Sequence, residues 1–467
     1  MCNRTRTASI HTLDGDSLLH VFYLCRPFLG DEYGPAEWSY NRYWWYRLAH
    51  ICQRWRNIIF GSASYLGLSL VCTYGTPVAD MLAHSPPLPL VIGYFVKDRD
   101  LTTEDEEGLI LALKQRDRVR RVRFGDAVKQ KLFVDIDEEY PILEYLYITR
   151  RKEDNSTNLR FPETFHAPHL RYLLLSGFAL PIGSRLLTTA VGLVTLHLVM
   201  VHPSTYFHPN TLIQWISLMP HLETLKIILK SPIPNRGAER QLTHAPNIAP
   251  ITLPNLHRIN FRGVSSYLEE LVHRITTPRL KRLVFEFFNQ LSYSVPRFLQ
   301  FIDAAEILRF EEAIFTFSDK RVDVGVSPRT ETTPYALTIG VFCWHLDWQV
   351  SFATQISNSL SKMFSVERLV LQHKVHSESS EEHNEVDHTE WRKLFRPFSN
   401  VKILRVGKGL FKDISRCLQL EDGELPFELL PKLQELIYHE SSDTGGAFTS
   451  FIDARRNAGR PVTLVRR

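Results

Sequence analysis

The sequence predicts a mixed α/β fold in which parallel strands and helices alternate along the chain. The first observation is a pattern, apolar-x-x-apolar-x-apolar, that recurs in ten short stretches and is usually introduced by proline. The second is that the units also carry a segment whose apolar residues have helical spacing. The first apolar position of the copies falls at Val119, Leu143, Leu170, Leu193, Leu222, Leu256, Leu280, Val366, Val401 and Leu433.

The spacing of these copies is close to that of leucine-rich repeats, whose units run about 20–29 residues. A strand and a helix cannot bury an apolar face alone, whereas stacked copies share one core, so the pattern predicts a solenoid. The interval from Leu280 to Val366 has room for about three further units of this length. Arg151, Phe178 and Lys230 follow three of the strands, where such repeats often carry asparagine or cysteine, so we expect irregular turns.

The segment before Val119 shows how the helical half of a unit is encoded. Thr103-Glu104-Asp105-Glu106 has the spacing of a capping box, whose side chains satisfy free amides at the start of a helix. Leu109, Ile110 and Leu113 follow at helical spacing. We therefore expect a helix that begins at about residue 103.

Composition is that of a chain with a large buried core and a balanced charge. Of the 467 residues, 44% are hydrophobic and 23% are charged. The net charge of +4 comes from 55 basic and 51 acidic residues. This balance is unlike a nucleic-acid-binding footprint, so we expect no nucleic-acid partner.

Cysteine usage and hydropathy predict a location in the cytoplasm or the nucleus. The six cysteines are scattered and contain no C-x-x-C pair, which indicates free thiols rather than a zinc site or a redox dithiol. Residues 1–17 are polar and lack the apolar run of a signal peptide. Residues 57–79 carry no charge but are diluted by glycine, serine, threonine and proline, so we expect no membrane association.

The first 70 residues carry a different pattern, that of two short helices. Asp14 or Asp16 can accept hydrogen bonds from free amides at a helix start, and an apolar stripe of Leu18, Leu19 and Phe22 follows. A polar, aromatic-rich connector leads to the second helix. One face of this second helix is predicted to hold Leu48, Ile51, Cys52, Trp55, Ile58 and Ile59.

Two segments resemble the F-box, a small helical module that docks onto the Skp-type adaptor of cullin-RING ubiquitin ligases. Leu13-Asp14-Gly15-Asp16-Ser17-Leu18-Leu19-His20-Val21-Phe22 is similar to the opening helix of the family, and Leu48-Ala49-His50-Ile51-Cys52-Gln53-Arg54-Trp55-Arg56 is similar to its V-C-R-R-W segment. The stretch to Leu70 and the ending from Phe448 to Val465 resemble F-box-like leucine-rich-repeat proteins of mushroom-forming fungi. The resemblance implies adaptor-binding residues at Leu13, Leu18, Leu19, Phe22, Leu48, Ile51, Cys52 and Trp55.

Two departures from this family leave a second interpretation open. The family usually opens with Leu-Pro, where this chain has Leu13-Asp14, and the connector over residues 31–43 is longer than usual. In the second interpretation, the apolar stripe that includes Trp55 packs as a cap onto the first repeat, because a solenoid must shield its terminal core. The module would then recruit no adaptor.

No catalytic or cofactor motif accompanies these features, so we expect neither an enzyme nor a cofactor. The chain has no G-x-S-x-G elbow and no G-x-x-x-x-G-K-[ST] phosphate loop. Histidines and carboxylates gather over residues 373–390, including His383 and His388, but without H-E-x-x-H spacing. This polar stretch predicts a mobile surface loop rather than a metal site.

Two further clusters each have a functional and a structural interpretation. A basic cluster near the first repeat strand could meet an acidic partner or form a solvated rim. It consists of Arg116, Arg118, Arg120, Arg121 and Arg123. Trp344 and Trp348 could form a ligand-contact patch or fill the core of the least regular part of the repeats.

These features divide the chain into an F-box-like helical module over residues 1–70, a linker or cap over 71–90, and an irregular leucine-rich-repeat solenoid over 91–467. The resemblance implies a substrate-receptor subunit of an SCF-type (Skp-cullin-F-box) ubiquitin ligase. Its partners would be the Skp-type adaptor with its cullin complex, bound by the module, and an unidentified target protein, bound by the repeats. The alternative is a leucine-rich-repeat interaction scaffold that keeps a non-recruiting F-box remnant.

Overall fold

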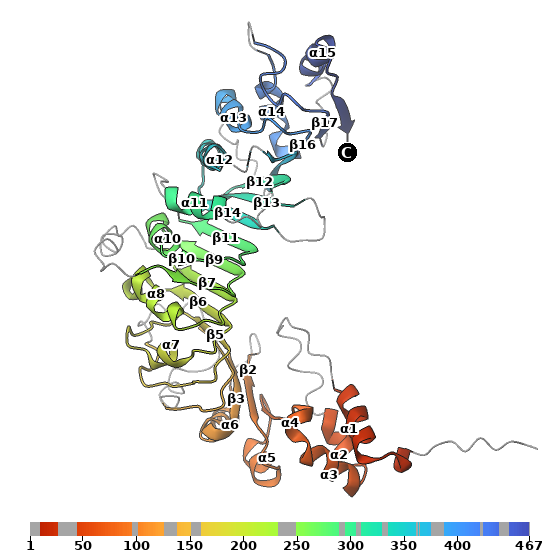
Figure 1. Ribbon diagram of the computed structural model, residues 1–467, viewed down its shortest axis with the longest axis vertical. Coiled ribbons are helices and arrows are strands. Elements are labelled where there is room, and N and C mark those ends of the chain that lie inside the picture. Colours follow the sequence, from red (N-terminus) through yellow and green to blue (C-terminus); the bar gives the residue numbers. More distant parts are fainter. Residues whose placement is uncertain are drawn as a thin grey trace, which may run out of the picture. The chain divides into compact units, whose positions relative to one another are not determined.

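The protein consists of two compact units, Met1–Leu193 (unit 1) and Val194–Arg467 (unit 2), seen in a computed structural model (Figure 1). The structure describes residues 10–26, 44–95, 101–125, 138–150, 160–231, 249–288, 295–304, 310–328, 335–360, 363, 365–374, 387–420, 424–438 and 448–466. Every helix within these ranges is too short or too polar to cross a lipid bilayer.

Unit 1 begins with a helical module. Its elements are the 3-10 turn Ile10–Thr12 and the helices α1 (Gly15–Leu24), α2 (Trp44–Ala49), α3 (Gln53–Gly61) and α4 (Ala63–Leu66). Helix α1 begins after Asp14, whose Oδ1 accepts a hydrogen bond from the backbone amide of Ser17 at 2.7 Å. Of the two predicted caps, Asp14 is therefore the one in place.

The predicted second helix is in fact two helices. Helix α2 ends at Ala49, and α3 begins after Cys52, whose backbone is extended (φ −159°, ψ 167°). The prediction assumed one continuous helix with a single apolar face. Because the helical conformation is interrupted between α2 and α3, Ile51 does not lie on that apolar face and is 53% exposed.

The rest of unit 1 is a parallel sheet with helices between its strands. The strands are β1 (Leu70–Cys72), β2 (Leu90–Tyr94), β3 (Val119–Phe124), β4 (Tyr145–Thr149) and β5 (Tyr172–Ser176), paired in that order. The helices are α5 (Val78–His84), α6 (Thr103–Leu113), the 3-10 turn Arg116–Arg118 and α7 (Arg185–Thr189). Residues 71–90, predicted as a linker or cap, thus contain most of β1 and all of α5, and the sheet begins at Leu70.

Helix α6 forms the predicted capping box one residue earlier than expected. Thr102 is the cap: its hydroxyl accepts from the backbone amide of Asp105, and the Asp105 carboxylate accepts from the Thr102 amide. Asp105 is 3% exposed and also accepts a hydrogen bond from the backbone amide of Gly75 at 2.8 Å. This additional bond to the β1–α5 turn favours Asp105 over Glu106 as the box residue.

Unit 2 continues the alternation of strands and helices. Its sheet strands are β6 (Thr195–Val201), β7 (Thr224–Leu229), β9 (Arg258–Gly263), β11 (Arg282–Phe287), β12 (Glu312–Ser318), β13 (Arg321–Ser327), β14 (Leu337–Phe342), β15 (Arg368–Lys374), β16 (Ile403–Val406), β17 (Glu435–Tyr438) and β18 (Thr463–Arg466). A separate pair is formed by β8 (Ile251–Thr252) and β10 (Ile275–Thr276).

The helices of unit 2 lie along one side of its strands (Figure 1). They are α8 (Pro209–Ser217), α10 (Ser265–Val272), α11 (Pro296–Ala304), α12 (Leu346–Ser359), α13 (His388–Phe395), α14 (Phe411–Cys417) and α15 (Thr449–Asn457), with 3-10 turns at Pro203–Thr205 and Lys408–Leu410. The arrangement is the expected mixed α/β architecture with mainly parallel strands.

All ten predicted repeat strands are present. In nine of them the strand begins two residues after the first apolar position, as with Leu143 and β4, and in the tenth it begins at Val119 itself. The three apolar positions point into the core: Leu143, Leu146 and Ile148 are each at most 1% exposed. Register aligns these positions between neighbouring strands, so that Leu146 lies beside Leu173 of β5.

The interval from Leu280 to Val366 differs from the prediction of three further repeat units. Only β14 pairs with β11 in parallel, while β12 and β13 form an antiparallel hairpin closed at Asp319 and Lys320. The order across this region is β11-β14-β13-β12-β15. The apolar alternation of a strand is the same in either direction, so the sequence pattern did not reveal the reversal.

Candidate interaction surfaces

Three of the eight predicted adaptor-binding residues lie in the interior of the helical module. Leu18 is 0%, Phe22 is 1% and Trp55 is 6% exposed. They face one another across α1 and α3, and the rings of Phe22 and Trp55 are in edge-to-face contact. Their burial argues against direct contact with an adaptor, and their adaptor-binding role stays a prediction.

The other five predicted residues remain accessible to different degrees. Ile51 is exposed in the break between α2 and α3, and Leu13, Leu19, Leu48 and Cys52 are half-buried. The adaptor-binding role of these five stays a prediction. Residues 27–43, which include the long connector, lie outside the described part of the chain.

The module also exposes large apolar side chains that the helical stripe did not identify. They are Ile10, Tyr23, Leu24, Tyr46 and Tyr65. Together with Ile51 they make up six of the 16 exposed large apolar side chains among the described residues. The rings of Tyr23 and Tyr65 lie next to each other, with centroids 5.2 Å apart, and exposed apolar side chains that gather in one patch commonly mark an interaction site. Tyr23 and Leu24 directly follow the buried stripe of α1 in sequence, and this position was the signal from which the sequence could have identified them as exposed.

The outer face of the unit 1 sheet carries packed aromatic and arginine side chains. The guanidinium carbon of Arg123 lies 4.1 Å from the ring centroid of Phe95 and 4.9 Å from that of Tyr147. The rings of Tyr145 and Tyr172 stack with centroids 4.4 Å apart. Burial raises the pKa of Tyr172 to about 12 and that of Tyr145 above its usual range, so both phenols are neutral near pH 7.

The basic cluster around the first repeat strand is largely satisfied within unit 1. Arg116 pairs with Glu138, and Nε of Arg120 lies 2.8 Å from the Glu144 carboxylate. Arg118 donates to backbone carbonyls of the segment before β2. These bonds favour the structural interpretation of the cluster over a surface for an acidic partner.

The two tryptophans of the irregular region lie on the surface of unit 2. Trp344 is 65% and Trp348 is 50% exposed, so they do not fill the core. The ammonium group of Lys320 lies 5.1 Å from the ring centroid of Trp344, and the His345 and Trp348 rings are 5.7 Å apart. Their exposure excludes the core-filling interpretation, and the ligand-contact interpretation stays a prediction.

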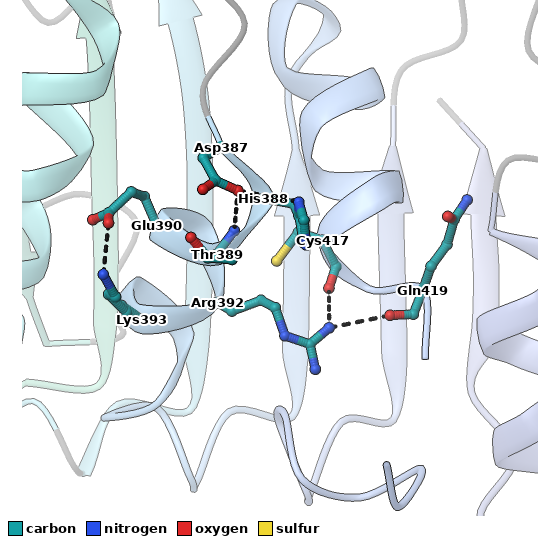
Figure 2. Close-up of polar contacts among 8 residues, drawn as sticks. All are labelled: Asp387, His388, Thr389, Glu390, Arg392, Lys393, Cys417 and Gln419. Carbon is teal, nitrogen blue, oxygen red and sulfur yellow. Dashed lines mark hydrogen bonds and ion pairs between the residues drawn. The ribbon is translucent and has the colours of Figure 1, made fainter. Parts of the chain in front are cut away.

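The histidine-rich stretch contributes structural contacts where it is described. Asp387 caps α13 by accepting from the amide of Thr389 at 3.1 Å, and Nδ1 of His388 lies 3.2 Å from its carboxylate (Figure 2). His383, and with it most of the predicted mobile loop over 373–390, lies outside the described residues. Among the residues that the structure does describe, no three metal-ligating side chains gather into a site.

Helix α13 is tied to the end of α14 by an arginine. Arg392 donates to the carbonyl oxygens of Cys417 and Gln419 at 3.0 and 3.1 Å (Figure 2) and pairs with Glu424. The carbonyls at a helix C-terminus have no partner within the helix, so a cation there is stabilising. This contact serves the stacking of the helices.

Comparison with known proteins gives little further information. No protein-family model matches the chain, and no curated protein matches it. One similar solved structure is the crystal structure of the leucine-rich repeat-containing protein LegL7 from Legionella pneumophila, with 11% sequence identity, a TM-score of 0.26, and coverage of 85% of this chain and 99% of that one. The similarity is too loose to support a conclusion about function. The arrangement described above defines a mixed α/β protein of stacked strand–helix units.

Proposed function

We propose that this chain is a non-catalytic interaction protein that holds a partner protein on the outer face of its repeat strands. We further propose that its helical module is F-box-like and docks onto a Skp-type adaptor, which would make the chain a substrate receptor of an SCF-type ubiquitin ligase. The reaction would then depend on proximity, because another subunit of the ligase brings the ubiquitin-charged enzyme to the bound target.

The observation that carries the adaptor proposal is the exposed apolar surface of the module. Ile51, Leu24 and Tyr46 are 53%, 68% and 51% exposed, although isoleucine and leucine are among the side chains most often buried. A partner that covered them would remove this surface from water, at about 25 cal/mol per Å² of apolar area. The interior residues Phe22 and Trp55 would support the docking surface without touching the adaptor.

The test is co-purification of the full chain with a Skp-type adaptor. Ile51→Glu and Leu24→Glu each place a charge in the proposed interface, and each should weaken association by about tenfold or more. Ile182→Glu is the matched control, because Ile182 is 73% exposed but lies outside the module. Thermal unfolding of each variant must match that of the unmodified chain.

A folded chain that fails to bind the adaptor would overturn this proposal and favour the second candidate, a repeat-based scaffold with a non-recruiting remnant. The burial of Leu18, Phe22 and Trp55 is the observation that supports this candidate. In that case the module serves as an end cap, and Ile51→Glu leaves all partners of the chain bound.

A further inference from the structure

Three cationic side chains gather on the outer face of unit 2, and none of them forms an ion pair with a residue that the structure describes. They are Lys226 of β7, Arg258 of β9 and Arg282 of β11, which we call the basic patch. Arg258 lies directly beside Arg282 in the parallel register, and Thr224, two residues before Lys226, lies beside Arg258. Neighbouring strands are about 4.8 Å apart, so the three groups share a compact area.

Strand alternation directs these side chains away from the core. Leu225, Ile259 and Leu283 occupy adjacent positions on the three strands and are at most 2% exposed. Successive side chains of a strand point to opposite faces, so their cationic neighbours lie on the outer face. Each member of the basic patch is half-buried, so part of its side chain is in contact with solvent.

Carboxylates do not neutralise the basic patch. On the described strands β6, β7, β9 and β11 the single carboxylate is that of Glu286. Its oxygens lie 3.8 Å from guanidinium nitrogens of Arg262 and of Arg321. No ion pair joins the basic patch to any described residue. Nε of Arg282 is shielded from solvent and lacks a hydrogen-bond partner within the described chain.

The local electrostatic field reflects this excess of positive charge. Burial, Lys226 and Arg258 together lower the pKa of the neighbouring His197 to about 4, so its imidazole is neutral near pH 7. Burial and Arg258 also lower the pKa of Arg282. Like charges that face one another without a partner are destabilising, and an anion placed between them would relieve the repulsion.

We propose that the basic patch binds an acidic segment of a partner protein, with carboxylates seated between Arg258 and Arg282 and beside Lys226. Guanidinium groups bind carboxylates through two parallel hydrogen bonds, and the side-by-side arginines present several donors to one segment. The inference deepens the proposed function, because it names the chemistry of the target, and it rests on the proposal that the repeat strands hold that target.

The extent of the basic patch favours a polypeptide over a nucleic acid. On β11 itself and on β13 the same face carries the carboxylates of Glu286 and Asp323, which pair with Arg262 and Arg321. A nucleic-acid backbone needs a longer uninterrupted basic stripe, and the net charge of the chain is only +4. A short acidic segment of a protein matches a basic patch of this small size better than a nucleic-acid backbone does.

The test is fluorescence anisotropy of the full chain with a labelled poly-glutamate peptide, at low and at physiological ionic strength. The expected result is saturable binding that weakens as salt is added. Arg258→Gln and Arg282→Gln should each weaken it by about fivefold, in the upper range for one accessible ion pair. Arg279→Gln is the matched control, because it removes an exposed arginine just before β11 and should leave binding unchanged.

Three results would overturn the proposal: no binding of poly-glutamate, equal loss of binding in Arg279→Gln, or tighter binding of a single-stranded oligonucleotide of matched charge. Adaptor co-purification with Arg258→Gln separates this inference from the proposed function. Retained adaptor association together with lost peptide binding supports both. Peptide binding by a chain that recruits no adaptor supports the basic patch and rejects the ligase role.

Discussion

Phe22 of α1 and Trp55 of α3 lie edge to face, with ring centroids 4.9 Å apart and ring planes at 60°. This contact joins two helices that are separated by 28 residues in sequence, because α1 ends at Leu24 and α3 begins at Gln53. Aromatic pairs in this geometry contribute about 0.5–1.5 kcal/mol beyond the area they bury. The pair therefore helps to hold α1 against α3.

Phe22→Ala and Trp55→Ala should each lower the free energy of unfolding of the module by about 3–5 kcal/mol, because each opens a cavity in a small core. The double variant should lose less than the sum, since both substitutions remove the same contact. Denaturant unfolding followed by circular dichroism measures these changes. Ile51→Ala is the control and should stay within about 0.5 kcal/mol; a Trp55→Ala variant of unchanged stability would contradict the packing.

Trp391 and Trp344 should respond in opposite ways to truncation. Trp391 of α13 is 0% exposed and contacts the ring of Phe317, so Trp391→Ala should destabilise unit 2 by about 3–5 kcal/mol. Trp344 is 65% exposed, so Trp344→Ala should change stability by less than about 0.5 kcal/mol. Thermal unfolding compares the two variants, and a large loss in Trp344→Ala would place that ring in the core after all.

His197 should make unit 2 sensitive to acid between about pH 6.5 and pH 4. Burial first, then Lys226 and Arg258, lowers its folded-state pKa to about 4, whereas the unfolded chain titrates near its ordinary value of 6.5. The unfolded chain therefore binds the proton first, and stability falls as the pH drops through this window, by on the order of 3 kcal/mol. His197→Gln should remove this slope from denaturation curves recorded against pH, and an unchanged slope would contradict the assignment.

Arg455 of α15 should be required for the stability of the C-terminal end. It is 0% exposed and donates to the carbonyl oxygens of Pro426 and Leu430 at 3.0 and 2.8 Å. Arg455→Met would leave these buried acceptors without donors and should cost about 2–3 kcal/mol. Arg456→Met is the matched control, because Arg456 is exposed and its partner among the described residues is Asp453 at the surface; equal losses in both variants would argue against a buried role.

The sequence predicted the repeat strands well because their positions follow from burial alone. Leu222, Leu225 and Ile227 are at most 1% exposed, and such a triplet has to face a core wherever it occurs. The same reasoning missed the direction of β13, because alternation indicates which face is buried and carries no information about the neighbouring strand.

The candidate docking surface was less predictable for a similar reason. A helical stripe such as Leu18, Phe22 and Trp55 marks buried positions, and here it marks the interior of the module. The exposed residues are those that the stripe leaves out, such as Leu24, or those displaced by the break before Cys52. Extended backbone at a single residue depends on tertiary packing, which one sequence does not display.

The β12–β13 hairpin has a consequence for the modular construction of unit 2. Two reversals of direction cancel, so β14 and β15 on either side of the hairpin run the same way. On both strands the buried apolar side chains lie at corresponding positions, as with Ile339 of β14 and Leu371 of β15. In a shortened chain without residues 312–327, β14 and β15 would still run in the same direction, so β15 could pair directly with β14. Helix α12, which packs on the hairpin, would have to move across the width of the two missing strands. Because the hairpin has an even number of strands, it leaves the direction of the strands that follow it unchanged.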